Sequence, residues 1–273
     1  MSEEVRPSIS AGSWYPNDPE KLKQMIHEFF GNVESSSIRG RIFGLISPHA
    51  GFIYSGQTAA YAYKQLYLRE FDVVVILCPM HHPGPGKYVT SGDIAYETPL
   101  GDVPVDRDLL RQLQKSVDIE EMFFDKEHAI ENQLPFLQSV LSHFKILPIM
   151  VGHMDVHDVE DIVAGLTDLL NGRSALLVAS TDLNHMYDYD AVKSNDERVI
   201  NTLVSYDLTS IRQLFSQKEM TVCGQVPVSI VLDVAKRQGA LSVQILNHTT
   251  SVDVIGSYIP GQYTVGYLSA LIY

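Results

Sequence analysis

The sequence predicts an α/β protein, with three layers, a largely parallel central sheet, helices on both faces and an inserted antiparallel hairpin. Continuous apolar runs bounded by turn signals recur along its 273 residues. Strands that are buried on both faces lose the alternation of polar and apolar residues, so such runs are typical of parallel sheets. Amphipathic stretches lie between and around them, and strands alternating with helices indicate a three-layer arrangement.

Four apolar runs are the predicted sheet strands. They are "RIFGLIS" (41–47), "DVVVILC" (72–78), "FKILPIMVG" (144–152) and "SALLVAS" (174–180).

Six stretches have helical spacing. The first opens on Asn17 or Asp18 as a cap, with Pro19 just inside, and the last has Pro227 in its first turn and Gly239 as its stop. The predicted helices cover 17–30, 56–68, 129–144, 156–170, 190–206 and 226–239.

The segment 87–106 alternates polar and apolar residues around a "PLGD" turn, which predicts an antiparallel hairpin at an edge of the sheet. The tail "GQYTVGYLSALIY" is predicted to end as a hydrophobic strand. The chain contains no repeat, low-complexity tract or linker, so a single domain over residues 1–273 is expected.

Composition excludes some functions. The formal net charge of −13 repels phosphate backbones and anionic lipids, so nucleic-acid and membrane-surface binding are disfavoured. No apolar run reaches about 18 residues, and the start "MSEEVRPSIS" does not resemble a signal peptide. Two cysteines without a secretory signal favour reduced thiols and a cytoplasmic protein.

Reactive side chains follow the predicted strands where each of them ends. Ligands of open α/β sheets bind outside the carboxyl ends of the strands, so these turns are expected to converge. "SPHAGFIYSG" carries His49 and Tyr54, "PMHHPGPG" carries His81 and His82, and "STDLNHMYDYD" carries Asp182 and His185. "VCGQVP" brings Cys223 to the start of a helix, and "DKEHAIENQLPF" contains Glu127, His128 and Glu131.

Each motif alone has an ordinary explanation. His49 and the pair His81 and His82 suit turns, Cys223 suits a small buried position, and His128 with Glu131 suits a solvated helix face. Their coincidence favours a metal site instead. Imidazole and thiolate together suit zinc, iron or copper, and three ligands leave open positions for catalysis. One of the adjacent histidines is expected to bind metal and the other to support the site or contact substrate, while Asp182 accepts the far N–H of a ligand histidine.

In this order and with these separations, "PHAGFIYSG", "MHH", "EHAIENQLPF", "STDLNH" and "VCGQVP" resemble the Memo family, as does the opening "AGSWYP". The resemblance spans nearly the whole chain and extends to the AmmeMemoRadiSam system protein B type. It implies the fold of class III extradiol dioxygenases, whose iron is held by two histidines and a glutamate. It also implies iron or copper as cofactor, with radical-SAM and AMMECR1-like proteins as partners.

Carried over by motif, His49 and His81 match the two histidine ligands, and His185 matches the acid/base histidine. Cys223 stands where the dioxygenases have a glutamate. A thiolate is oxidisable, which weakens the ring-cleavage interpretation and keeps the metal interpretation.

Three hypotheses follow. The first is an oxidoreductase with one Fe(II) or copper ion on His49, His81 and Cys223, in which His185 moves protons. The second is a zinc hydrolase in which His185 or Asp182 takes the proton of a bound water. The third is a peptide- or phosphotyrosine-binding module using the same pocket, for which the motifs supply no arginine. Tyr54, His82, His128 and Glu131 are candidates for substrate contact or for support of the ligands.

Overall fold

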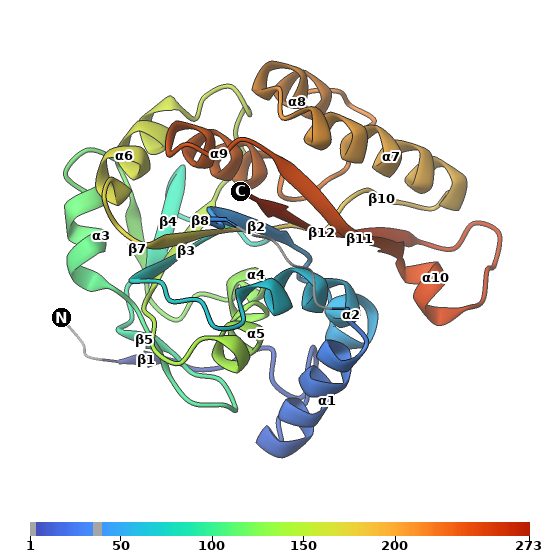
Figure 1. The fold of residues 1–273 in the computed structure, drawn as a ribbon, viewed down its shortest axis with the longest axis horizontal. Helices are drawn as coiled ribbons and strands as arrows, with labels where there is room; N and C mark the ends of the chain where they lie inside the picture. Colours follow the sequence, from blue (N-terminus) through green and yellow to red (C-terminus); the bar gives the residue numbers. More distant parts are fainter. Residues whose placement is uncertain (1–3, 35–39) are drawn as a thin grey trace.

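The computed structural model describes residues 4–34 and 40–273 and confirms the predicted three-layer α/β class. Figure 1 shows helices on both sides of a large central sheet. The strands of that sheet run in the order β10-β12-β2-β9-β3-β8-β4-β7, with β11 paired to β12. Their bounds are β2 (Gly44–Ser47), β3 (Val73–Pro79), β4 (Tyr88–Ser91), β7 (Glu120–Met122), β8 (Ile146–Val151), β9 (Ala175–Ser180), β10 (His185–Met186), β11 (Val243–Thr250) and β12 (Thr264–Ile272).

The four strands predicted from apolar runs form the centre of the sheet. β2, β9, β3 and β8 are mutually parallel in that order, whereas β12 joins β2, and β4 joins β8, in antiparallel fashion. Their apolar runs are continuous because each face lies in its own core. In β3, Val73, Val75 and Leu77 belong to one buried cluster. Val74, Ile76 and Cys78 belong to the other.

Each face of the sheet has its own set of helices (Figure 1). One face packs against α1 (Pro19–Gly31), α2 (Phe52–Tyr63), α4 (His128–Glu131) and α5 (Leu134–Val140). The other packs against α3 (Arg107–Leu113), α6 (Glu160–Leu170), α7 (Tyr189–Ser205), α8 (Leu208–Phe215) and α9 (Gln225–Arg237). A 3-10 turn, η1 (Lys64–Leu66), follows α2, and α10 (Ser251–Ile255) lies between β11 and β12.

Three expected helices differ in the structure. The helix expected over 156–170 begins only at Glu160, as α6. The stretch 129–144 is not one helix but α4 and α5, because Pro135 has no N–H for the carbonyl four residues earlier and starts a new helix instead. The second helix begins at Phe52 rather than at 56, directly after Gly51, and ends at Tyr63.

The hairpin expected in 87–106 is confirmed around "PLGD", where β5 (Ala95–Tyr96) and β6 (Val103–Pro104) pair antiparallel. Its expected place at an edge of the central sheet is wrong, because these two strands belong to a separate sheet. The preceding β4 belongs to the central sheet. β5 also pairs in parallel with β1 (Val5–Arg6), which completes a separate three-stranded sheet. This small sheet fixes the N-terminal segment beside α4.

In the described part of the chain, no helix combines the length and the apolar composition needed to cross a membrane.

Candidate metal centre

The carboxyl ends of three neighbouring parallel strands bring the candidate ligands together. His49 follows β2, His81 follows β3, and Asp182 follows β9, which lies between β2 and β3. Cys223 lies at the same place. It directly precedes Gly224, which is the N-cap of α9. One ligand atom from each of His49, His81 and Cys223 lies within 4.8 Å of the other two. We call these three residues the His/His/Cys cluster.

Within this cluster, Cys223 Sγ lies 3.4 Å from His49 Nε2. The sulfur also accepts the backbone N–H of Asp182 at 3.3 Å. Burial, followed by the nearby Asp182 carboxylate, raises the pKa of the Cys223 thiol to about 12. Burial, followed by His81, lowers the pKa of His49 to about 3. The pair is therefore neutral at pH 7 and is not the thiolate–imidazolium pair that an activated cysteine nucleophile needs.

Hydrogen bonds fix which nitrogen of His49 is free. Ser180 donates its hydroxyl proton to the carbonyl of Ala129 at 2.8 Å. The Ser180 oxygen therefore accepts the Nδ1–H of His49, at 2.9 Å. Nε2, the nitrogen next to Cys223, is left with its lone pair available for a metal ion.

His81 is oriented in a similar way by Glu127. Glu127 Oε1 lies 2.9 Å from His81 Nδ1, and Oε2 accepts the backbone N–H of His81 at 2.7 Å. Burial opposes ionisation of Glu127, but the bonds from His81 outweigh it and lower its pKa to about 2. A carboxylate behind a ligand histidine fixes the ring and increases its basicity, and here it leaves Nε2 of His81 free.

Asp182 contacts the cluster differently from the expected ring hydrogen bond. Its Oδ1 accepts the backbone N–H of His49 at 2.8 Å, while Oδ2 lies 4.0 Å from His49 Nε2. Burial raises the pKa of Asp182. The ring contacts expected of Asp182 are instead made by Ser180 and Glu127.

His185 lies beside the cluster rather than within it. Its positive charge, when present, lowers the pKa of His49, so the two rings are electrostatically coupled. Its Nε2 is buried and has no hydrogen-bond partner among the described residues. Burial lowers the pKa of His185, which favours the neutral ring as a proton acceptor.

Of the four remaining candidates, only His128 is close to the cluster. Its ring stacks on His81, with centroids 4.7 Å apart, and on Trp14 at 4.1 Å. His82 is exposed on the loop after β3. Tyr54 lines a pocket of about 410 Å³ that also contains Trp14 and Gly51.

The structure does not bring Glu131 into the cluster, because its carboxylate is occupied elsewhere. It accepts hydrogen bonds from Arg6 Nη1 at 2.7 Å and from the hydroxyls of Ser8 and Tyr15 at 2.6 Å. The backbone N–H groups of Ile9 and Ser10 also donate to it. Glu131 thus ties the N-terminal segment to α4.

Two functional contacts, those of Ser180 and Glu127, were not assigned from sequence. Glu127 precedes a helix and caps it, since its Oε1 accepts the N–H of Ala129, and a capping residue gives no sign of a second partner. Ser180 ends an apolar strand, where a serine is unremarkable. The available signal for Ser180 was its position at the end of β9, and for Glu127 it was the histidine that follows it in the same motif.

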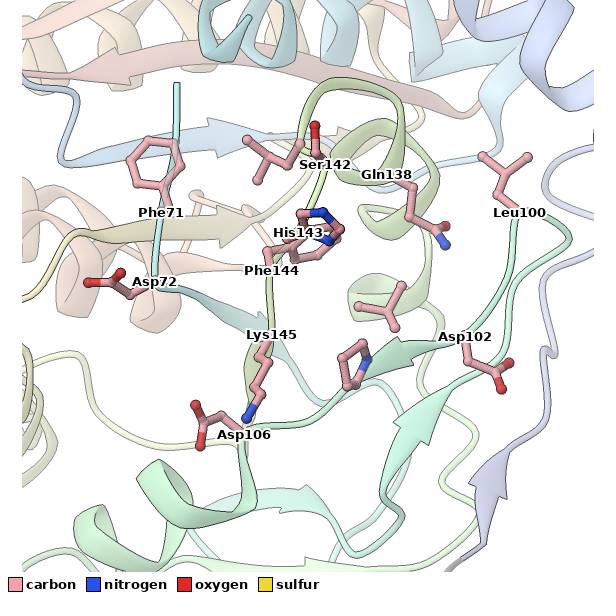
Figure 2. Close-up of a pocket in the computed structure, with 13 residues that line it drawn as sticks. Phe71, Asp72, Leu100, Asp102, Asp106, Gln138, Ser142, His143, Phe144 and Lys145 are labelled. Carbon is pink, nitrogen blue, oxygen red and sulfur yellow. The ribbon is translucent and has the colours of Figure 1, made fainter. Parts of the chain in front are cut away.

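A hollow of about 740 Å³ lies at the opposite ends of the strands, where Asp72 precedes β3 and Lys145 precedes β8 (Figure 2). Its lining includes Asp102, Asp106 and His143, but none of the site residues predicted from sequence. It is therefore separate from the His/His/Cys cluster.

Comparison with known proteins identifies the family of this chain. The family model described as "Memo-like protein" matches residues 6–271, nearly the whole chain. This chain belongs to the Memo family.

Its similarity to individual members of the Memo family also extends over nearly the whole chain. A MEMO1 family protein of Nitrosopumilus maritimus is 34% identical over 262 residues, covering 92% of this chain and 94% of that protein. One of Methanosarcina barkeri is 33% identical, covering 98% and 100%. One of Saccharolobus solfataricus is 36% identical, covering 95% and 96%.

A crystal structure of an uncharacterized protein from Escherichia coli K12 superposes with a TM-score of 0.58 and 13% identity, covering 85% of this chain and 100% of that one. At 13% identity, this similarity concerns the fold and not the function.

Ser180→Ala is expected to cost about 1–3 kcal/mol of the free energy of unfolding, because it leaves buried polar partners unsatisfied. These are His49 Nδ1, the carbonyl of Ala129 and one bond of Gln133 Nε2. Urea unfolding of the parent, of Ser180→Ala and of the control Ser269→Ala measures the loss of unfolding free energy. Ser269 is also fully buried on a strand, but its hydroxyl has no partner among the described residues, so its loss is expected to be near neutral. Equal losses in the two variants would contradict the role given to Ser180.

Proposed function

We propose that this Memo family protein is a metal-dependent oxidoreductase that binds one transition-metal ion through His49 Nε2, His81 Nε2 and Cys223 Sγ. The observation that carries the proposal is that one ligand atom from each of these three residues, which come from separate segments, lies within 4.8 Å of the other two. Imidazole and thiolate together suit iron, copper and zinc. The resemblance to the Memo family favours iron(II) or copper among them, and zinc is the alternative.

The spacing of the ligands supports the fit. An ion about 2.3 Å from sulfur and about 2.05 Å from nitrogen, at a tetrahedral angle, separates these two atoms by roughly 3.6 Å. Cys223 Sγ and His49 Nε2 are 3.4 Å apart, so this pair needs almost no rearrangement.

The surroundings of the rings support it as well. Both histidines have their Nδ1 atoms beside fixed partners, Ser180 and Glu127, and both therefore have Nε2 available. Such partners commonly stand behind metal-binding histidines and hold the correct tautomer.

When bound, the ion supplies Lewis acidity and, for iron or copper, one-electron chemistry. The chain's own residues would then handle protons. His185, with an unpartnered Nε2, is the proposed proton carrier. Asp182 positions His49 through its backbone N–H and, being ionisable, is the second candidate for proton transfer.

One observation favours a second candidate function, a zinc hydrolase. Cys223 is oxidisable, and a thiolate ligand is compatible with hydrolysis but is exposed to damage in an enzyme that handles O₂ in each turnover. His185 or Asp182 would take the proton of a zinc-activated water in that case. Identification of the bound metal separates the two functions.

Metal content tests the proposal. Protein purified anaerobically is expected to hold about one tightly bound transition-metal ion per chain. The variant His49→Ala/His81→Ala/Cys223→Ser is expected to bind that ion more than about 100-fold more weakly, since loss even of residues behind a ligand costs 10–100-fold. Elemental analysis and competition with a chelator measure both quantities. His82→Ala, the exposed neighbour, is the control and should keep the metal.

Binding of the ion by the triple variant with the affinity of the parent would refute the site. Iron or copper in the parent supports the oxidoreductase, and zinc supports the hydrolase.

A further inference from the structure

A second group of metal-ligating side chains shares His81 with the first. One ligand atom from each of His81, Glu127 and His128 lies within 4.8 Å of the other two. His81 Nδ1 lies beside Glu127, while Nε2 is the nitrogen assigned above to the His/His/Cys cluster. The two groups therefore use different nitrogens of one ring.

The spacing of Glu127 and His128 matches a pair of ligands. Glu127 Oε1 lies 3.3 Å from His128 Nδ1, and no hydrogen bond joins these two described residues. An ion about 2.1 Å from oxygen and about 2.05 Å from nitrogen, at a tetrahedral angle, places such atoms roughly 3.4 Å apart. The contact from Glu127 Oε1 to His81 Nδ1, now 2.9 Å, would have to open by roughly half an ångström on the same reasoning.

Orientation of His81 alone does not account for this arrangement. That role explains Glu127, and the stack on Trp14 explains an aromatic ring at position 128. Neither requires a ring nitrogen next to the buried carboxylate. A cation between His128 and Glu127 accounts for both the nitrogen and its distance.

Charge favours a cation here. The side chain of Glu127 is only 2% exposed, so its carboxylate is largely shielded from water. The His128 ring is 14% exposed, which leaves an approach from solvent.

We propose that the protein holds a second divalent cation between Glu127, His128 Nδ1 and His81 Nδ1, so that His81 bridges two ions. The inference rests on the proposed function, because it assigns His81 Nε2 to the first ion. Two imidazole nitrogens and a carboxylate suit zinc, iron(II) or cobalt(II). Binding of the second ion releases the Nδ1 proton of His81 to solvent, and lack of a thiolate makes this position weaker than the first.

Cobalt(II) titration of metal-free protein under anaerobic conditions tests the inference. A thiolate-to-cobalt charge-transfer band reports occupation of the Cys223 position, whereas the second position has no sulfur and gives no such band. The parent is expected to bind two ions per chain, the first with the band and the second with ligand-field absorption and release of one proton.

His128→Phe keeps an aromatic ring for the stack on Trp14 and removes the nitrogens. It is expected to bind one ion with the band intact, while His82→Phe, the adjacent control, binds two. Cys223→Ser is expected to lose the band. Thermal melting of each variant checks that it is folded.

A parent that shows the band but binds a single ion would overturn the second position and leave the first intact. Two ions in folded His128→Phe, or loss of its band, would also overturn it. A parent without the band would refute the first site and the bridge with it.

Discussion

Replacement of Glu131 by glutamine is expected to lower the free energy of unfolding by about 3–5 kcal/mol, the usual cost of removing one partner from a buried ion pair. Glutamine keeps one acceptor oxygen, so its NH₂ group replaces either the oxygen that accepts from Arg6 or the oxygen that accepts from Ser8 and Tyr15. Among the described residues, fully buried Arg6 would retain only Asp125 as an ionic partner, and burial raises the pKa of that carboxyl. Urea unfolding at pH 7 measures the loss.

Glu160→Gln is the matched control. Glu160 pairs with Arg237 at 2.7 Å, but its side chain is 68% exposed, so loss of that pair is expected to cost less than about 1 kcal/mol. Similar small losses in both variants would show that the Arg6–Glu131 pair does not stabilise the N-terminal segment.

The parent and Glu131→Gln are expected to differ in their response to acid. Burial alone would raise the pKa of Glu131, but hydrogen bonds from Ile9 N–H, Ser8 and Tyr15 outweigh it and hold the pKa below the ordinary value of 4.5. Stability from such a group is present above the unfolded pKa and is lost as pH falls through the folded pKa. The difference in unfolding free energy between the parent and Glu131→Gln should therefore narrow below about pH 4.5. A constant difference down to pH 3 would contradict this assignment.

The second large effect separates Cys223 from His185. Cys223→Ser is expected to weaken binding of the first metal ion more than about 100-fold, because it removes a ligand. His185→Gln is expected to keep the metal content of the parent and to abolish metal-dependent activity, because His185 is the proposed proton carrier and is not a proposed ligand. Metal analysis of both variants, prepared side by side, measures the contrast. Loss of metal from His185→Gln with retention in Cys223→Ser would reverse the two roles.

Cys223→Glu extends this test. It creates a site of two histidines and one carboxylate, which suits non-haem iron(II), so the preference is expected to shift from copper toward iron. Competition between Fe(II) and Cu(I) measured on the parent and on this variant checks the shift, and an unchanged ratio would mean that position 223 does not bind the ion.

Sequence alone determined the central layer and the place of the candidate site. The apolar runs of β2, β3, β8 and β9 are continuous because both faces of the sheet are buried, and that pattern is local. The rule that ligands bind at the carboxyl ends of parallel strands then brought His49, His81 and Asp182 together without coordinates.

Only the tertiary structure decided which partners these residues have. Glu127 and Glu131 are four positions apart in one motif, yet Glu127 orients His81 whereas Glu131 binds Arg6, 125 positions away in the sequence. Local spacing predicts which residues share a helix face, but it does not predict which distant segment packs against that face. The small sheet of β1, β5 and β6 places Arg6 next to α4, and that long-range pairing makes Glu131 a structural residue and leaves Glu127 with the histidines.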